Sequence, residues 1–282
     1  MQKPNKNQKH NIMKRLSLVV IGVGCLVFQA QAQLFQEGFN YTSGANLAGN
    51  GPWTGGNANI SIGSANLTYP GLSNLGGNDL SLVAGASAST SAANFTATAI
   101  TSGTVYYSFL LESTALPTAN SYLTSLLNTG SAGPSGSADP LAVYVGTTAG
   151  GFKIGVRHTG VGSGATYASG TYGTVGSVDL IVVGYTFGGG GSESLWINPT
   201  PGGSMPAANV TVAAGGTEAT GLQVVGFKSN STGAAAGTWL FDNLLIGTSW
   251  ADVTPIAVPE PSTFALAGLG MLGLVFARRM RR

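Results

Sequence analysis

The sequence predicts an all-β protein: an antiparallel β-sandwich flanked by an N-terminal signal peptide and a C-terminal apolar helix. Short segments rich in Val, Ile, Thr, Tyr and Phe alternate with Gly, Ser, Asn and Pro clusters between residues 34 and 255. This alternation is typical of closely spaced antiparallel strands. The chain has 44 Gly and 8% charged residues, against about 25% charged residues in an average soluble domain. Two uncharged apolar runs, 16–28 and 262–277, lie outside this region, one near each end.

The N-terminal segment has the order of a secretory signal peptide. Lys14 and Arg15 precede the uncharged run 16–28, and Ala30 and Ala32 then form a small-x-small site. This arrangement predicts a signal peptide over residues 1–32, cleavage after Ala32 and passage through the Sec translocon.

Two alternatives stay open in this segment. Translation could begin at Met1 or at Met13, since Met13 already precedes a sufficient basic region. Cys25 raises a lipoprotein alternative, but Gly22 stands where a lipobox normally has Leu. Because Cys25 is the single cysteine, its removal would leave a mature chain without thiols or disulfides.

The body, residues 33–251, is predicted to consist of short strands. The candidates are 60–62, 66–69, 80–84, 95–101, 105–111, 141–146, 152–158, 166–172, 178–185, 194–197, 210–213, 222–228 and 239–246. Segment 152–158 alternates apolar and polar residues, which predicts a strand with one solvent-exposed face. Segment 178–185 contains an apolar run, which predicts a central strand buried on both faces. Apolar residues recur at helical spacing within 119–128, which makes this segment the one candidate for a helix in the body.

The charge of the body differs from that of the whole chain. The chain has a formal net charge of +2, yet most of its cations lie in the two terminal segments. Residues 33–257, the body with the start of the linker, contain three cations, Lys153, Arg157 and Lys228, against nine acids, a net charge of −6. So few cations cannot neutralise a row of phosphates, which excludes nucleic acid as a partner.

The C-terminal segment has three consecutive parts. Val258, Pro259, Glu260 and Pro261 form a Pro-Glu-Pro motif at the end of a Pro-rich linker, 252–261, for which an extended conformation is expected. The uncharged stretch 262–277 follows, and as a helix it would rise about 24 Å, short of a roughly 30 Å hydrocarbon core. The expected membrane-anchor residues are Phe264, Leu266, Leu269, Leu272, Leu274, Val275, Phe276, Arg278, Arg279, Arg281 and Arg282.

These three parts resemble the PEP-CTERM sorting signal of Gram-negative envelope proteins. The resemblance implies recognition by an exosortase-type membrane peptidase, cleavage near the Pro-Glu-Pro motif, and delivery to the cell surface or the extracellular matrix. The precursor would be held in the inner membrane by the segment 262–282, with the arginines on the cytoplasmic side.

The body carries a second resemblance. The segment 37–41 with 47–49 and Trp53, and the segments 195–199 and 241–247, are similar to those of concanavalin A-like (LamG-type) domains found on other PEP-CTERM proteins. The resemblance implies a curved jelly-roll sandwich, a fold used by lectins, adhesion modules and some glycosidases.

Catalysis is not expected from the body. Glycosidases need two carboxylates close together, and the nearest body acids in sequence are Asp242 and Asp252, which no single strand presents as a pair. His158, the one histidine of the body, lacks a G-x-S-x-G elbow and is interpreted as a strand-end residue partly covered by the sheet. We therefore expect a structural or adhesive protein, and a glycoside hydrolase or polysaccharide lyase on the same fold is the alternative.

Binding residues can be proposed from side-chain chemistry. Trp53, Tyr69, Tyr167 and Tyr172 lie in polar, Gly-rich segments and could stack on sugar rings of an extracellular polysaccharide. Lys153 and Arg157 share one strand face and could meet an acidic polysaccharide, although a solvated sheet face explains them and is favoured.

No cofactor is expected, but structural calcium stays open. Suitable oxygen donors are the side chains of Asn78, Asp79, Asp139, Asp242, Asn243 and Asp252. Such Asp and Asn residues also cap and shape turns, which is the favoured interpretation.

Overall fold

The computed structural model describes residues 33–136, 138–160, 164–231, 237–257 and 278–279. The predicted signal peptide with Ala30 and Ala32, the Pro-Glu-Pro motif and the apolar run 262–277 lie outside these residues. Within the described residues, no helix is both long and apolar enough to cross a membrane.

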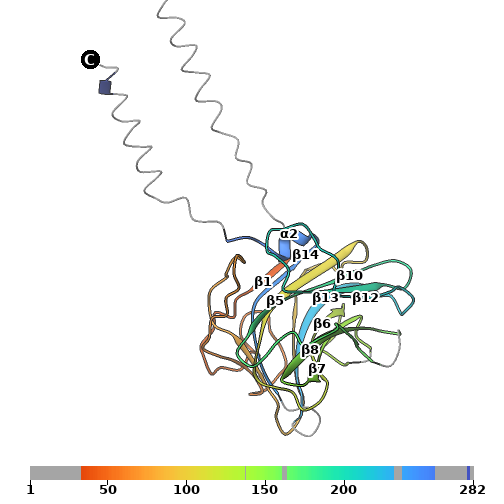
Figure 1. Ribbon diagram of the computed structural model, residues 1–282, viewed down its shortest axis with the longest axis horizontal. Coiled ribbons are helices and arrows are strands. Elements are labelled where there is room, and N and C mark those ends of the chain that lie inside the picture. Colours follow the sequence, from red (N-terminus) through yellow and green to blue (C-terminus); the bar gives the residue numbers. More distant parts are fainter. Residues whose placement is uncertain (1–32, 137, 161–163, 232–236, 258–277, 280–282) are drawn as a thin grey trace, which may run out of the picture. The chain divides into compact units, whose positions relative to one another are not determined.

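The body is a sandwich of two antiparallel sheets (Figure 1), which confirms the predicted all-β class. The eight-stranded sheet has the order β12 (Val210–Val212), β11 (Ser192–Ile197), β10 (Val178–Thr186), β5 (Thr104–Ala115), β14 (Thr238–Gly247), β3 (Leu80–Val83) and β2 (Ile60–Ile62), with β1 (Phe35–Glu37) also paired to β14. The six-stranded sheet has the order β4 (Ser89–Asn94), β13 (Leu222–Ser229), β6 (Ser121–Asn128), β7 (Leu141–Thr148), β8 (Gly151–His158) and β9 (Thr166–Tyr167).

The main core lies between the two sheets. Alternate residues of each strand point inward, and Phe227 of β13 meets Phe241 of β14 at 5.1 Å between ring centroids. Phe152 of β8 packs edge-on against Trp239 of β14 at 5.0 Å. Strand β10 is buried along most of its length between β5 and β11, which confirms that 178–185 is a central strand.

The outer face of the eight-stranded sheet is also covered. Leu67 and Leu72, from the segment before β3, pack with Leu110 and Val182 of the sheet in a second apolar cluster. The short helix α2 (Trp250–Val253) adds Val253 to this cluster. This sheet is therefore buried on both faces.

The helix α2 includes Asp252 and Val253, where the sequence predicts the start of an extended linker. Ser249 caps it, and the Asp252 carboxylate accepts hydrogen bonds from the backbone N–H groups of Thr248 and Ser249. Asp252 and Val253 are buried, so the body continues past residue 251 and the linker does not begin at Asp252. The capping residues favoured a helical turn over the extended conformation expected from the prolines.

Three other expectations about secondary structure were wrong. Segment 119–128 is not a helix, because its apolar residues form β6, a strand paired with β13 and β7. Segment 66–69 forms no strand, since the backbone N–H of Leu67 donates to Asp242 instead of a neighbouring strand. Segment 95–101 likewise contains no strand, and the side-chain amide of Gln223 donates to its carbonyls at Thr96 and Ala97.

Candidate carbohydrate-binding face

The outer face of the six-stranded sheet presents a row of tyrosines across four strands. Tyr122 of β6 pairs in register with Tyr144 of β7, and Tyr144 pairs with Gly155 of β8. Gly155 in turn pairs with Tyr167 of β9. Their inward neighbours on β7 and β8 belong to the main core, so the alternation of a strand places the row on the opposite, outer face. We call these four residues the tyrosine row.

Packing orders the inner part of the row. The rings of Tyr122 and Tyr144 stack with a centroid distance of 5.1 Å and an interplanar angle of 18°. The Tyr122 hydroxyl donates to the carboxylate of Asp139, in the segment between β6 and β7. Tyr122 is buried whereas Tyr144 is half-buried, so the ring of Tyr144 packs against an ordered neighbour and keeps accessible surface.

A glycine determines the position of Tyr167. A Cβ built on Gly155 would lie 2.7 Å from Cδ1 of Tyr167 and 2.7 Å from the carbonyl oxygen of Thr166. The missing side chain at Gly155 therefore leaves the space in which the Tyr167 ring lies across β8. Tyr167 is half-buried, so its ring is held and also partly accessible.

The three cations of the body belong to the same sheet. The Nζ of Lys153 lies 4.6 Å from the ring centroid of Tyr167, and the Nζ of Lys228 lies 5.2 Å from that of Tyr122. Arg157 lies two residues after Gly155 on β8, and its buried Nε has no hydrogen-bond partner among the described residues. All three cations are half-buried.

The hydroxyls of Tyr122 and Tyr167 are weaker acids than a free tyrosine. Burial raises the pKa of Tyr167 to about 12, with a further contribution from Tyr144. Burial and then the Asp139 charge raise the pKa of Tyr122 well above its usual value of about 10. Both hydroxyls stay protonated at neutral pH and can only donate or accept hydrogen bonds.

The carboxylates of Glu37 and Asp242 accept hydrogen bonds from other groups of the same chain. Glu37 accepts hydrogen bonds from the backbone N–H of Phe39, the Tyr41 hydroxyl and the Trp53 indole N–H. Asp242 accepts from the backbone N–H groups of Leu67 and Asn243, and burial raises its pKa to about 7. These carboxylates hold the N-terminal loops on the sandwich.

His158 and Glu193 form a buried pair between the sheets. Nδ1 of His158 lies 3.3 Å from Oε1 of Glu193 and 2.9 Å from the carbonyl oxygen of Pro140. Its Nε2 lies 2.7 Å from the carbonyl oxygen of Gly190. Both ring nitrogens face acceptors, and the hydrogen bond to Glu193 raises the pKa of His158. The pair is fully buried, so the expectation that His158 is only partly covered was wrong.

The structure separates the four residues expected to stack on sugars. Trp53 is 1% exposed and packs against Phe39 and Phe227, so it presents no face to a ligand. Tyr69 packs against the second apolar cluster, on the eight-stranded sheet, and Tyr172 packs against the main core. Tyr167 alone of the four belongs to the tyrosine row.

The sequence did not indicate Tyr122, Tyr144 or Lys228 as binding residues. The alternation of Leu141, Val143 and Val145 could have placed Tyr144 on an outer face, because these three residues share the other side of the strand. Tyr122 was hidden by the helical interpretation of its segment.

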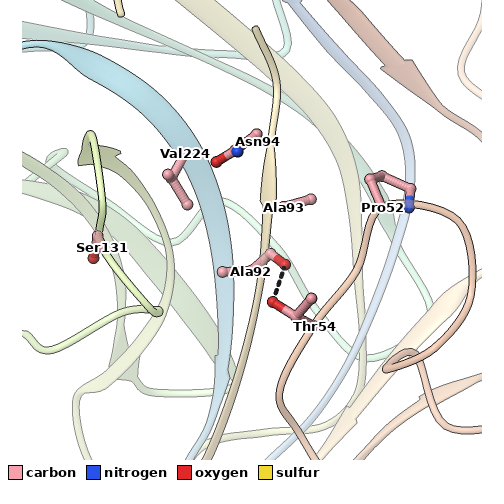
Figure 2. A pocket seen from close by; sticks show the side chains of 7 residues that line it. All are labelled: Pro52, Thr54, Ala92, Ala93, Asn94, Ser131 and Val224. Atoms are coloured by element: carbon pink, nitrogen blue, oxygen red, sulfur yellow. Dashed lines mark hydrogen bonds between the residues drawn. The ribbon is translucent and has the colours of Figure 1, made fainter. Parts of the chain in front are cut away.

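A hollow of about 110 Å³ lies beside the edge strand β4 (Figure 2). Its wall includes Asn94 and Val224, and the hydroxyl of Thr54 donates to the carbonyl of Ala92 at 3.3 Å beside it. Pockets for small molecules usually enclose about 300–1,000 Å³. The hollow is too small for such a ligand.

The possible calcium donors form no cluster of metal ligands among the described residues. Within the described residues, no group of three or more His, Cys, Asp or Glu side chains could hold a metal ion. Asp79 accepts from the backbone N–H of Ala65, and Asp139 accepts from Ser135 and Gly136. Like Asp252 and Asp242, these carboxylates shape turns of the chain.

The comparison with protein families identifies the C-terminus. Residues 257–282 match the PEP-CTERM protein-sorting motif. The chain carries a PEP-CTERM sorting signal. The PEP-CTERM motif implies export, sorting toward the cell surface, and processing by an exosortase in the membrane.

Solved structures resemble the body of this PEP-CTERM chain. The structure of alginate lyase Aly36B matches with a TM-score of 0.50 and 13% identity, over 76% of this chain and 96% of that chain. A glycosyl hydrolase family protein from Mycobacterium fortuitum matches at 0.46 and 13%, over 76% and 99%. The cellulose-induced protein Cip1 matches at 0.42 and 14%, over 76% and 97%. At such identities the likeness shows a jelly-roll-like fold, and no curated protein matches the chain.

Proposed function

We propose that this chain is an exported, non-catalytic carbohydrate-binding protein of the cell surface, which binds an extracellular polysaccharide on its tyrosine row. Its route would be the Sec translocon and the inner membrane of a Gram-negative-type bacterium, followed by exosortase processing. The observation that carries the binding proposal is the register that aligns Tyr122, Tyr144 and Tyr167 across neighbouring strands.

The row suits a sugar chain because of its shape and rigidity. Aromatic side chains offer a flat apolar face together with a polar tip, which matches the apolar faces and the hydroxyl groups of pyranose rings. Tyr144 and Tyr167 are held in place before binding, by stacking on Tyr122 and by the space over Gly155. A ligand that meets ordered side chains loses less affinity to their immobilisation.

The chemistry of the face favours binding over catalysis. A glycosidase needs two carboxylates about 5–10 Å apart across the scissile bond, and the six strands of this sheet contain no Asp or Glu. Abstraction of a proton by a tyrosine would need a hydroxyl with a lowered pKa, whereas the pKa of Tyr167 is raised to about 12.

A polysaccharide lyase is the second candidate. It is favoured by the fold shared with the alginate lyase Aly36B structure, together with Lys153 and Tyr167 lying side by side on the open face. A lyase would release unsaturated products, which absorb ultraviolet light, so the two candidates differ in a simple assay.

The test is a glycan array with the full-length chain, followed by affinity measurements on the polysaccharide that binds. Replacing Tyr144 with Ala should weaken binding about 3- to 10-fold, the value of one aromatic contact. Tyr106→Ala is the matched control, because Tyr106 is a half-buried tyrosine on the other sheet, beside Trp196 and Trp250.

Equal weakening by both variants, or no binding to any glycan, would refute the proposed function. Release of reducing ends or unsaturated products from the bound polysaccharide would instead establish the enzyme.

A further inference from the structure

The charges of the body are segregated between its two sheets. Strands β8 and β13 contain Lys153, Arg157 and Lys228, which are all the cations of residues 33–257. None of the six strands of this sheet contains an acid. The Asp139 carboxylate, in the segment before β7, accepts a hydrogen bond from Tyr122 at this face. Residues 33–257 carry a net charge of −6, so a face with all three cations and one carboxylate is opposite in sign to the remainder.

From this segregation we infer that the ligand of the tyrosine row is an anionic polysaccharide with carboxylate groups, such as a polyuronate. The inference rests on the proposed function and specifies the chemistry of its ligand. Charge complementarity of this kind directs a ligand to one face and excludes ligands of the wrong charge.

The cations are available for an external anion. Within the described residues, the one ion pair closer than 4.0 Å joins His158 and Glu193, in the interior. Lys153 and Lys228 lie over tyrosine rings, and Nε of Arg157 has no hydrogen-bond partner in the part of the chain that the structure describes. A half-buried cation without a carboxylate partner has lost part of its hydration, so an anionic ligand can restore favourable interactions that the fold leaves unmade.

The arrangement favours a polymer over a single sugar. Lys228 lies on β13 and Lys153 on β8, which are separated by β6 and β7. Three steps between neighbouring strands correspond to about 14 Å, which is longer than one sugar ring. A chain that runs across the strands over Tyr144 and Tyr167 would place acidic groups near both cations at once.

The same arrangement disfavours nucleic acid, the other common polyanion that binds aromatic and basic residues. Its phosphates lie close together along every strand, so a nucleic acid long enough to cross the face would extend over the acidic remainder of the body. A polyuronate has one charge on each sugar and fits three separated cations.

The experiment compares matched polymers that differ only in charge. The probes are polygalacturonate, polymannuronate and hyaluronate, each tested as the free acid and as its methyl ester, with single-stranded DNA as a further probe. The full-length chain should bind at least one free acid, more weakly as salt increases, and should bind the corresponding ester and DNA at least tenfold more weakly.

Variants then assign the effect to the three cations. Replacing Lys153, Arg157 and Lys228 together with Gln should weaken binding of the free acid by up to about 100-fold, at about fivefold per cation. Glu112→Gln is the control, because it changes the net charge through a half-buried side chain of β5, on the other sheet.

The outcomes separate the inference from the proposed function. Equal binding of a free acid and its ester would overturn the anionic ligand and leave a carbohydrate-binding row in place. Equal binding of DNA and polyuronate would also overturn the inference, since it would reveal a general polyanion site. Failure to bind any of these polymers, together with binding of a neutral glycan on the array, would overturn the inference alone. Failure to bind any glycan at all would overturn the proposed function itself.

Discussion

Replacing Gly155 with Ala tests the central feature of the proposed binding face, the close approach of Tyr167 to β8. The added Cβ would lie 2.7 Å from the carbonyl oxygen of Thr166, a backbone atom, and 2.7 Å from Cδ1 of Tyr167. Ordinary Cβ contacts are 3.4–4 Å, so β9 has to move away by more than half an ångström. Only two residues pair β9 with β8, and such a short strand offers little resistance to this displacement.

The expected cost follows from this overlap. Overpacking of this kind lowers the free energy of unfolding by about 1–3 kcal/mol, or about 2–12 °C in melting temperature for a domain of this size. Polysaccharide affinity should fall as well, because Tyr167 leaves the row. Thermal denaturation followed by circular dichroism measures the first effect, and titration with the bound polysaccharide measures the second.

Two other glycines provide graded controls. Gly164→Ala should leave stability unchanged or slightly higher, because a Cβ there meets nothing within 4 Å. Gly146→Ala should cost less than Gly155→Ala, since its Cβ approaches movable side-chain atoms of Lys153 and Tyr167. If Gly155→Ala matches the parent protein in both stability and affinity, Tyr167 does not lie across Gly155, and the proposed arrangement of the tyrosine row is refuted.

Three further results are expected. Stability should decrease from about pH 5 to about pH 8. Burial raises the pKa of Glu193 and of Asp242 to about 7, and the hydrogen bond to Glu193 raises the pKa of His158, so the folded state retains protons that the unfolded chain releases. A higher melting temperature at pH 8 than at pH 5 would contradict this. Trp53→Phe should cost about 1–3 kcal/mol of unfolding free energy, since Glu37 loses the indole N–H at 2.9 Å, and should leave glycan affinity unchanged. Residues 33–257 alone should fold without reductant, metal or tail, and a melting temperature raised by calcium would show a metal site in the Asp-Asn turns.

Processing of the tail can be measured directly in the native host. Intact-mass analysis should find a mature product that lacks both Ala32 and Arg282. A cell-surface product that still carries Arg282 would contradict exosortase cleavage.

Much of the architecture could be predicted from local patterns. The apolar run in 178–185 indicated a central strand, and β10 is buried between β5 and β11. The alternation in 152–158 indicated a face bearing Lys153 and Arg157, and both are half-exposed on β8. Such patterns depend on the period of a strand, which is a property of neighbouring residues.

Other features depended on contacts between distant residues. Segment 119–128 has helical spacing, yet pairing with β13 and β7 makes it a strand. Trp53 has polar neighbours in sequence, yet Glu37 and Phe227 enclose it in the core. Tertiary packing outweighs local propensity in both cases, because the hydrogen bonds and apolar area gained exceed the small local preference.

The sequence by itself determined the sorting signal and the β-rich class, since the first is a linear motif at 257–282 and the second follows from residue periodicity. Only the tertiary structure decided where the proposed binding face lies. Tyr122, Tyr144 and Tyr167 come from three strands whose order and register bring them into one row beside all three cations of the body. Strand register is set by the fit of whole side-chain faces against the core, and a shift of one residue in β7 would turn Tyr144 inward.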